Sequence, residues 1–168
     1  MKSEAYASQA SEFIHPGART PIALYAPVAA KVLELSVLVR EGNDGSKVAE
    51  LAGETIRLLL APGVMLGALA PTVDYGRVDR HWDIVSERGR HLGALRELHL
   101  HAAAYVTNAA RIAIEPAARA RLLFSMGRDA NAMIEHLAAI LAIHGFTPGE
   151  VAAHDLRRLG EVAEASRS

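Results

Sequence analysis

The sequence contains no cysteine, which excludes disulfide bonds, thiolate zinc sites and thiol nucleophiles. Aromatic residues are also few, with one tryptophan, four tyrosines and three phenylalanines. The N-terminal residues lack the apolar core of a secretory signal. The longest apolar stretch, Leu58 to Ala70, contains a proline and is too short to cross ~30 Å of hydrocarbon as a helix. These absences predict a cytoplasmic protein that does not enter a membrane.

The chain also lacks a large excess of charge of either sign. Its 168 residues carry a formal net charge of −1, and 51% of them are hydrophobic. These values exclude a polybasic or polyacidic protein and a disordered one. A chain of this length is long enough to form one domain with its own hydrophobic core.

Alanine is the residue that the chain has in quantity, with 32 copies. It is the strongest helix former, and its small side chain lets helices pack closely. Composition and periodicity therefore predict an all-α fold, a single-domain helical bundle of about five to seven helices. Residues 1–19 are expected to form an N-terminal arm with a short helix. Residues 20–168 are expected to form the helical bundle domain.

Prolines and glycines indicate where the helices begin and end. A regular helix is expected to begin near Pro27. The next is expected to run from Ser46 to about Ala61, because Pro62 should stop it. Pro116 is well placed to begin another helix, and Gly145 is well placed to end it.

Residues 28–39 leave two interpretations open. Only Lys31, Glu34 and Ser36 are polar there, which is typical of a helix at the centre of a bundle. Leu33 to Val37 also alternate between apolar and polar residues, as a β-strand would. We favour the helix, because no second convincing strand exists to pair with this one.

Two long segments carry apolar stripes at helical spacing. From about Gly76 to Ala113 a seven-residue repeat predicts a buried seam of Val78, Val85, Leu92, His99, Val106 and Ala113, with Leu95, Ala102 and Ala109 at the intervening positions. Arg88 falls on this seam next to Gly89, so either the helix breaks there or that stretch of the seam faces solvent. In the next segment one face collects Leu122, Met126, Ala130, Met133, Leu137, Leu141 and His144. A capping box from Thr147 to Glu150, with a proline at the first helical position, predicts a last helix that ends near Ala165.

His99 is the main candidate for a functional residue. It is expected within an apolar stripe, where a neutral imidazole needs a hydrogen-bond partner or a metal ion. His144 shares the apolar face of the next long helix. A pocket between helices near His99 and His144, with Arg96 close by, is therefore one prediction for ligand binding. The simpler interpretation is that a polar side chain satisfies each histidine. No metal-binding motif is present, so we predict neither a metal site nor a cofactor.

Basic residues gather in the middle of the chain. Residues 77–128 hold nine basic and five acidic residues, a net charge of +4, whereas residues 129–168 have a net charge of −3. Four arginines lie near one expected helix junction and are candidates for contact with an anionic partner: Arg111, Arg119, Arg121 and Arg128. The alternative is that they pair with the acidic C-terminal helix of the same fold.

The sequence shows no set of catalytic groups. It has no glycine-rich phosphate loop and no facing pairs of carboxylates. We therefore favour a non-catalytic helical protein that forms homo-oligomers and contacts another macromolecule, as a regulator, adaptor or accessory subunit. One alternative is a small helical enzyme or ligand-binding protein with the pocket near His99 and His144. A second, which we do not favour, is a nucleic-acid binder that uses the arginines of residues 77–128.

Overall fold

The computed structural model describes residues 1–14, 21–42, 44–85 and 91–167, and these form helices with no strand. The predicted all-α fold is confirmed. The helices are α1 (Ser3–Ser11), α2 (Pro21–Tyr25), α3 (Pro27–Arg40), α4 (Gly45–Leu66), η2 (Gly67–Leu69), α5 (Tyr75–Trp82), α6 (His91–Ile114), η3 (Pro116–Ala118), α7 (Arg119–Ile143) and α8 (Pro148–Ala165). The short α2 continues into α3, because Ala26 between them keeps helical backbone angles. Residues 28–39 are therefore helical, as we favoured.

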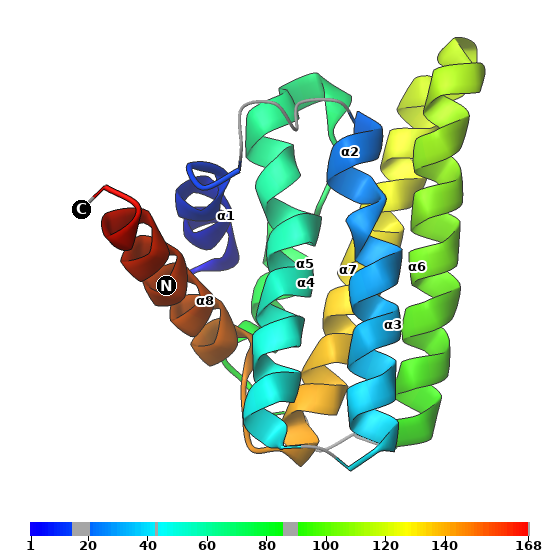
Figure 1. Cartoon of the computed structure of the whole chain (residues 1–168). Helices are drawn as coiled ribbons and strands as arrows, with labels where there is room; N and C mark the ends of the chain where they lie inside the picture. The colour runs from blue at the N-terminus through cyan, green and yellow to red at the C-terminus, as the bar shows by residue number, and fades with distance from the viewer. Residues whose placement is uncertain (15–20, 43, 86–90, 168) are drawn as a thin grey trace.

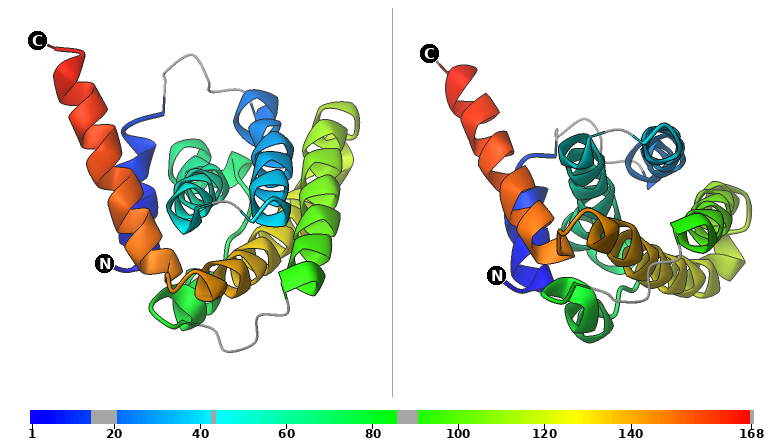
Figure 2. Two further views of the ribbon diagram at one scale, coloured as in Figure 1. Left: turned by 60° about the horizontal axis from the view of Figure 1, so that its bottom comes forward. Right: turned by 90° about the horizontal axis from the view of Figure 1, so that it is seen from below.

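Four long helices, α3, α4, α6 and α7, form the bundle (Figure 1). The chain runs down α3 and up α6, so these two neighbouring helices are antiparallel. The helices α1 and α8 pack on the side of α4 that faces away from α3 and α6 (Figure 2). The short helix α5 packs on α7. The bundle thus has one face, formed by α3 and α6, that no described helix covers.

The central helix is α4, which contacts α1, α3, α7 and α8. The span Gly45–Leu69 is long and apolar enough, by length and composition alone, to cross a membrane. Its apolar face, however, forms the core of the bundle, with Val48, Ile56 and Leu60 fully buried. The prediction that Pro62 ends this helix is wrong. Pro62 is buried within α4, and the helix continues past it to Leu66 while α4 packs on α1 and α3.

The core confirms one predicted stripe in full and the other in part. On α7 the predicted stripe from Leu122 to Leu141 is buried. The predicted seam from Val78 to Ala113 is instead divided between α5 and α6, and Val85 is 48% exposed. Residues 86–90 of that segment lie outside the described residues. On α6 the predicted positions Leu95, Ala102 and Ala109 are buried, whereas Val106 is half-buried and Ala113 is exposed. Ala94, Leu98 and Tyr105 complete the buried stripe of this helix.

The N-terminal helix α1 is tied to the rest of the chain. The backbone and hydroxyl groups of Ser3 donate hydrogen bonds of 3.0 and 2.7 Å to Asp79 Oδ1 on α5. The indole of Trp82 donates a 2.7 Å hydrogen bond to the carbonyl oxygen of Met1. Tyr6 and Ala10 are fully buried against the bundle. This arm therefore packs on its own chain.

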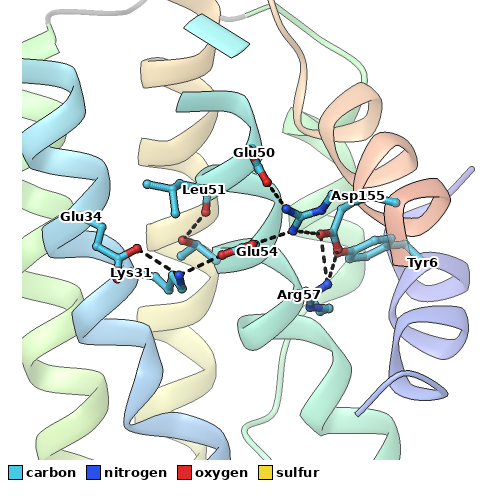
Figure 3. Close-up of polar contacts among 10 residues, drawn as sticks. Tyr6, Lys31, Glu34, Glu50, Leu51, Glu54, Arg57 and Asp155 are labelled. Atoms are coloured by element: carbon cyan, nitrogen blue, oxygen red, sulfur yellow. Dashed lines mark hydrogen bonds and ion pairs between the residues drawn. The ribbon is translucent and has the colours of Figure 1, made fainter. Parts of the chain in front are cut away.

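A buried carboxylate joins α1, α4 and α8 (Figure 3). Asp155 of α8, only 3% exposed, accepts a 2.9 Å hydrogen bond from the Tyr6 hydroxyl. It also accepts hydrogen bonds of 3.1 and 3.2 Å from Nη1 of Arg57 on α4. Burial raises the pKa of Asp155 above its ordinary value, although Arg57 and Tyr6 both act to lower it. Nη2 of Arg158 lies 3.6 Å from Oδ1 of the same carboxylate. The carboxylate therefore depends on its hydrogen-bond and ion-pair partners to remain ionised.

Further ion pairs extend this cluster to α3. Arg158 of α8 pairs with Glu50 and with Glu54 on α4, at 2.6 Å from Glu54 Oε1. Lys31 of α3 lies 3.0 Å from Glu54 and 3.0 Å from Glu34 (Figure 3). Each charge in this cluster has an internal partner, so we interpret the cluster as a connection between helices.

The capping box that was predicted for α8 is present, with Thr147 and Glu150 bonded reciprocally.

Candidate functional site

His99 lies where α6 meets α3, at the edge of the buried stripe. Its Nε2 is 2.6 Å from the hydroxyl oxygen of Ser36, which is itself 2.9 Å from the carbonyl oxygen of Val32. A hydroxyl has one proton, so with that proton donated to Val32, His99 donates from Nε2 to Ser36. The polar partner that the sequence required is therefore Ser36. This serine is only 2% exposed, so it is closed to a substrate.

A hollow of about 340 Å³ opens beside His99, between α3 and α6. It brings two of the predicted ligand-binding residues, His99 and Arg96, together with Arg40, and Leu95 and Leu100 complete its lining. Arg40 and Arg96 are exposed, and no described residue forms an ion pair with either. None of the described residues that line the hollow is a carboxylate. The hollow can therefore receive an anionic group.

Exposed apolar side chains continue from this hollow along the same two helices. Leu33 and Val37 of α3 are 59% and 46% exposed, and Leu100 of α6 is 54% exposed. Leu33 and Val37 lie one turn apart, and Leu100 lies one turn beyond Arg96. Six residues thus make up one surface, which we name the α3–α6 face: Leu33, Val37, Arg40, Arg96, His99 and Leu100.

His144 is placed apart from this hollow. It follows the last residue of α7 and covers Gly45 at the start of α4, where an added Cβ would lie 3.0 Å from its Nδ1. Its Nε2 is buried and has no hydrogen-bond partner among the described residues. His99 packs instead on α3, so the structure does not join the two histidines in one site.

The four arginines near the helix junction also separate. Arg111 pairs with Glu115 at the end of its own helix, through hydrogen bonds of 2.9 and 3.0 Å. Arg119 has a buried Nε with no partner among the described residues, whereas Arg121 is exposed. Arg128 follows Arg119 by nine residues, so it lies roughly 14 Å from Arg119 along α7. None of the four pairs with a described residue of α8, so that alternative is wrong for this part of the chain.

A histidine–aspartate pair that the sequence did not predict lies between α6 and α7. His101 Nδ1 is 2.9 Å from Oδ1 of the buried Asp129. The ring of His136 stacks on that of His101, with centroids 5.8 Å apart and planes at 21°. Burial and the nearby His101 lower the pKa of His136, although Glu97 and Glu135 act to raise it. A carboxylate on one ring nitrogen holds an imidazole in place, so His101 is oriented for contact with a ligand.

A hollow of about 420 Å³ adjoins this pair and extends to α5. Arg77 of α5 and Arg128 of α7 line it together with His101, Asp129 and His136. Arg77 pairs with Glu135, and this arginine holds the pKa of Glu135 below its ordinary value although burial acts to raise it. No described residue forms an ion pair with Arg128.

Close packing between α7 and the segment before α5 positions Arg77. An added Cβ on Gly127 would lie 1.9 Å from the carbonyl oxygen of Thr72, so only glycine allows this approach. The side chain of Asn131 accepts a 3.1 Å hydrogen bond from Asp74 N and donates one of 2.9 Å to Asp74 O. Asp74 then caps α5 by accepting a 3.0 Å hydrogen bond from the backbone N–H of Arg77. Arg77 is therefore held on a rigid support.

One signal for the site formed by His101, Asp129 and His136 was present in the sequence. On α6 and α7, polar residues recur at helical spacing and meet across the interface, as His101 meets Asp129 and Asn108 meets Ser125 at 3.3 Å. Matching two such stripes requires the relative register of two helices, which periodicity alone does not supply.

Among the described residues, no group of three or more histidine, aspartate or glutamate side chains is placed to hold a metal ion. The comparisons with known proteins identify no relative: no family model, curated protein or solved structure matches this chain.

Proposed function

We propose that this chain is a non-catalytic cytoplasmic binding protein whose α3–α6 face docks an acidic segment of a partner protein. One observation carries the proposal: Arg40 and Arg96 stand around one hollow, and no described carboxylate pairs with either. The activity that follows is that of a regulator, adaptor or accessory subunit.

The chemistry of the face defines the partner. Two arginines beside an apolar surface favour a segment that carries Asp or Glu next to Leu or Ile. Leu33, Val37 and Leu100 supply the apolar contact, and the hollow beside His99 receives the acidic side chain. An amphipathic helix meets these requirements, because its apolar and acidic residues recur on one face.

A second copy of the chain fits the same face poorly. The six residues of the α3–α6 face include no carboxylate, so two such faces would leave their arginines without partners. Homo-oligomer formation, which we expect from the sequence, is thus a separate proposal. Light scattering at dilute and concentrated protein tests it, and a monomer throughout would contradict it.

Selection of peptides from an unbiased display library on the full chain tests the docking proposal. We expect the selected peptides to combine acidic and apolar residues at helical spacing, and their binding to weaken as salt rises. Arg40→Glu and Arg96→Glu should each reduce affinity roughly tenfold, which corresponds to about 1.4 kcal/mol. Arg121→Glu, at an exposed position outside the face, is the matched control and should have no effect.

Three results would contradict the proposal. The selected peptides could be basic or uncharged, or their binding could be unaffected by the Arg40 and Arg96 variants. The third is a dimer that Leu33→Glu dissociates, since that result would identify a second copy as the occupant. Binding of sulfate alone at Arg40 and Arg96, with no peptide selected, would favour the alternative of a small-ligand pocket near His99.

A further inference from the structure

Two hollows beside α7 are joined by a shared pair of arginines. The first, of about 420 Å³, adjoins His101 and His136. The second, of about 210 Å³, adjoins Phe124. Arg77 and Arg128 line both hollows. Both hollows therefore adjoin these arginines, so a ligand that contacts Arg77 and Arg128 can extend toward either hollow.

Arg128 is the cation beside the two hollows that remains available to an anion. Glu135 pairs with Arg77, and Asp129 pairs with His101. The carboxylate of Asp74 caps α5. Each described carboxylate that lines the two hollows thus has an internal donor, while Arg128 has no ion-pair partner among the described residues. A guanidinium binds a phosphate group, as it does a carboxylate, with two parallel hydrogen bonds.

Phe124 supplies a flat apolar surface next to this anion site. Its side chain is 59% exposed, which is unusual for a large aromatic residue. Phe124 precedes Arg128 by four residues on α7, so the two side chains lie on the same helix face. An exposed aromatic ring beside an arginine is suited to stacking a nucleic-acid base while the arginine contacts its phosphate.

We propose that the two hollows form one binding site for a nucleoside phosphate. The phosphate lies between Arg128 and Arg77, and the base stacks on Phe124. His101, held by Asp129, and His136 form hydrogen bonds to the ligand on the other side of the arginines. Gly127 and Asn131 hold the segment before α5 in place, so the site is formed before the ligand binds.

Isothermal titration calorimetry on the full chain tests this site. The ligands are the four ribonucleoside 5′-monophosphates, ribose 5-phosphate, inorganic phosphate and the free nucleosides. We expect at least one nucleotide to bind about tenfold more tightly than ribose 5-phosphate, because stacking one base has an effect of this order. The free nucleosides should bind more weakly still. A single-stranded tetranucleotide in a second arm distinguishes a free nucleotide from a strand, which share the same chemistry.

Two variants test which residue contacts which part of the ligand. Phe124→Leu should reduce nucleotide affinity to that of ribose 5-phosphate, and Arg128→Gln should weaken binding of both. Both side chains are exposed, so the core is unaffected. The controls are Ile143→Ala, at a 48% exposed apolar position of α7, and Arg121→Gln, and both should bind as the wild type does.

Specific results would overturn the inference. Equal affinity for nucleotides and ribose 5-phosphate would show that the base does not stack on Phe124. Equal affinity for nucleotides and free nucleosides would show that Arg128 does not bind the phosphate. The absence of binding by any phosphate compound would overturn the whole site. Arg40→Glu and Arg96→Glu should leave nucleotide binding unchanged, so this test is independent of the docking proposal.

Discussion

The hydroxyl of Tyr6 donates a 2.9 Å hydrogen bond to Oδ2 of Asp155, which links the first helix of the chain to the last. Both side chains are buried, and Arg57 of the central helix α4 donates to the same carboxylate. Tyr105 is a buried tyrosine in a different situation, because its hydroxyl has no hydrogen-bond partner among the described residues. The two tyrosines therefore offer a matched comparison of a bonded and an unbonded buried hydroxyl.

Replacing each tyrosine with phenylalanine should have different effects on stability. Tyr6→Phe removes a hydrogen bond to a charged group and should lower the free energy of unfolding by about 1.5–3 kcal/mol. Tyr105→Phe removes a hydroxyl without a partner, so stability should stay the same or rise by about 1 kcal/mol. Urea denaturation of both variants measures the difference. An equal loss in the two variants would contradict this account of Asp155.

Arg57→Met should be among the most destabilising single changes. It leaves the carboxylate of Asp155, 3% exposed, without its main cationic partner. Removal of one member of a buried ion pair costs about 3–5 kcal/mol, because the other charge stays buried. A second change, Asp155→Asn, should restore part of the stability in the Arg57→Met background. The measurement is again chemical denaturation.

The matched control for Arg57 is Arg111→Met. Arg111 forms an ion pair with Glu115, but both side chains are more than 40% exposed. Solvent screens such a pair, so this variant should unfold close to the wild-type midpoint. Similar losses for Arg57→Met and Arg111→Met would show that burial does not set the strength of the Asp155 pair.

Local signals in the sequence were sufficient for much of the fold. The capping box at Thr147 and Glu150 involves neighbouring residues, and the stripe on α7 needs only the helical period. The buried stripe of α6 was predicted only in part. Leu95, Ala102 and Ala109 are buried as expected, but alanines such as Ala103 and Ala110 make several faces of that helix apolar, so the other buried positions were not identified. The continuation of α4 through Pro62 depends on packing by other helices, which the local sequence does not show.

The candidate sites could be predicted only in part. Arg96 and His99 lie one turn apart on one helix, so their proximity follows from helical geometry. Arg40, which completes their hollow, comes from another helix and needs the antiparallel pairing of α3 and α6. The second site likewise depends on the pairing of α6 with α7, which brings His101 to Asp129 and His136. Contacts between helices thus account for the parts of both sites that the sequence did not indicate.

Gly127→Ala should destabilise the fold and disturb the position of Arg77. The new Cβ would lie 1.9 Å from the carbonyl oxygen of Thr72, which forces the segment before α5 away from α7. Such overpacking costs about 1–3 kcal/mol. Gly160→Ala is the control, since an added Cβ there meets no atom within 4 Å and should stabilise α8 by about 0.5–1 kcal/mol. Thermal unfolding that shifts in the same direction for both variants would refute the close-contact argument.

His136 should make stability depend on pH just below neutrality. Burial and the nearby His101 hold the pKa of His136 below its ordinary value of 6.5 in the folded chain. Below pH 6.5 the unfolded chain therefore binds more protons than the folded one. The neutral His136 ring makes its full contribution to the free energy of unfolding above pH 6.5. That contribution is lost as the pH falls from 6.5 toward the pKa of His136 in the folded chain. His136→Gln should flatten the slope of unfolding free energy against pH in this interval.

A separate pH interval distinguishes the effect of His136 on stability from that of Glu115 and Glu135. The pKa values of Glu115 and Glu135 are held below their ordinary 4.5, so their contributions are lost only in more acidic solution. Asp155, whose pKa is raised, contributes equally to the wild type and to His136→Gln, so the difference between their profiles from about pH 5 to 7 isolates His136. His154→Gln, at an exposed position on α8, is the control. A slope that His136→Gln leaves unchanged would contradict the prediction, and an NMR titration of the His136 ring would locate its pKa directly. Because a phosphate at Arg128 would favour the protonated ring, the same titration should move upward when a nucleotide binds.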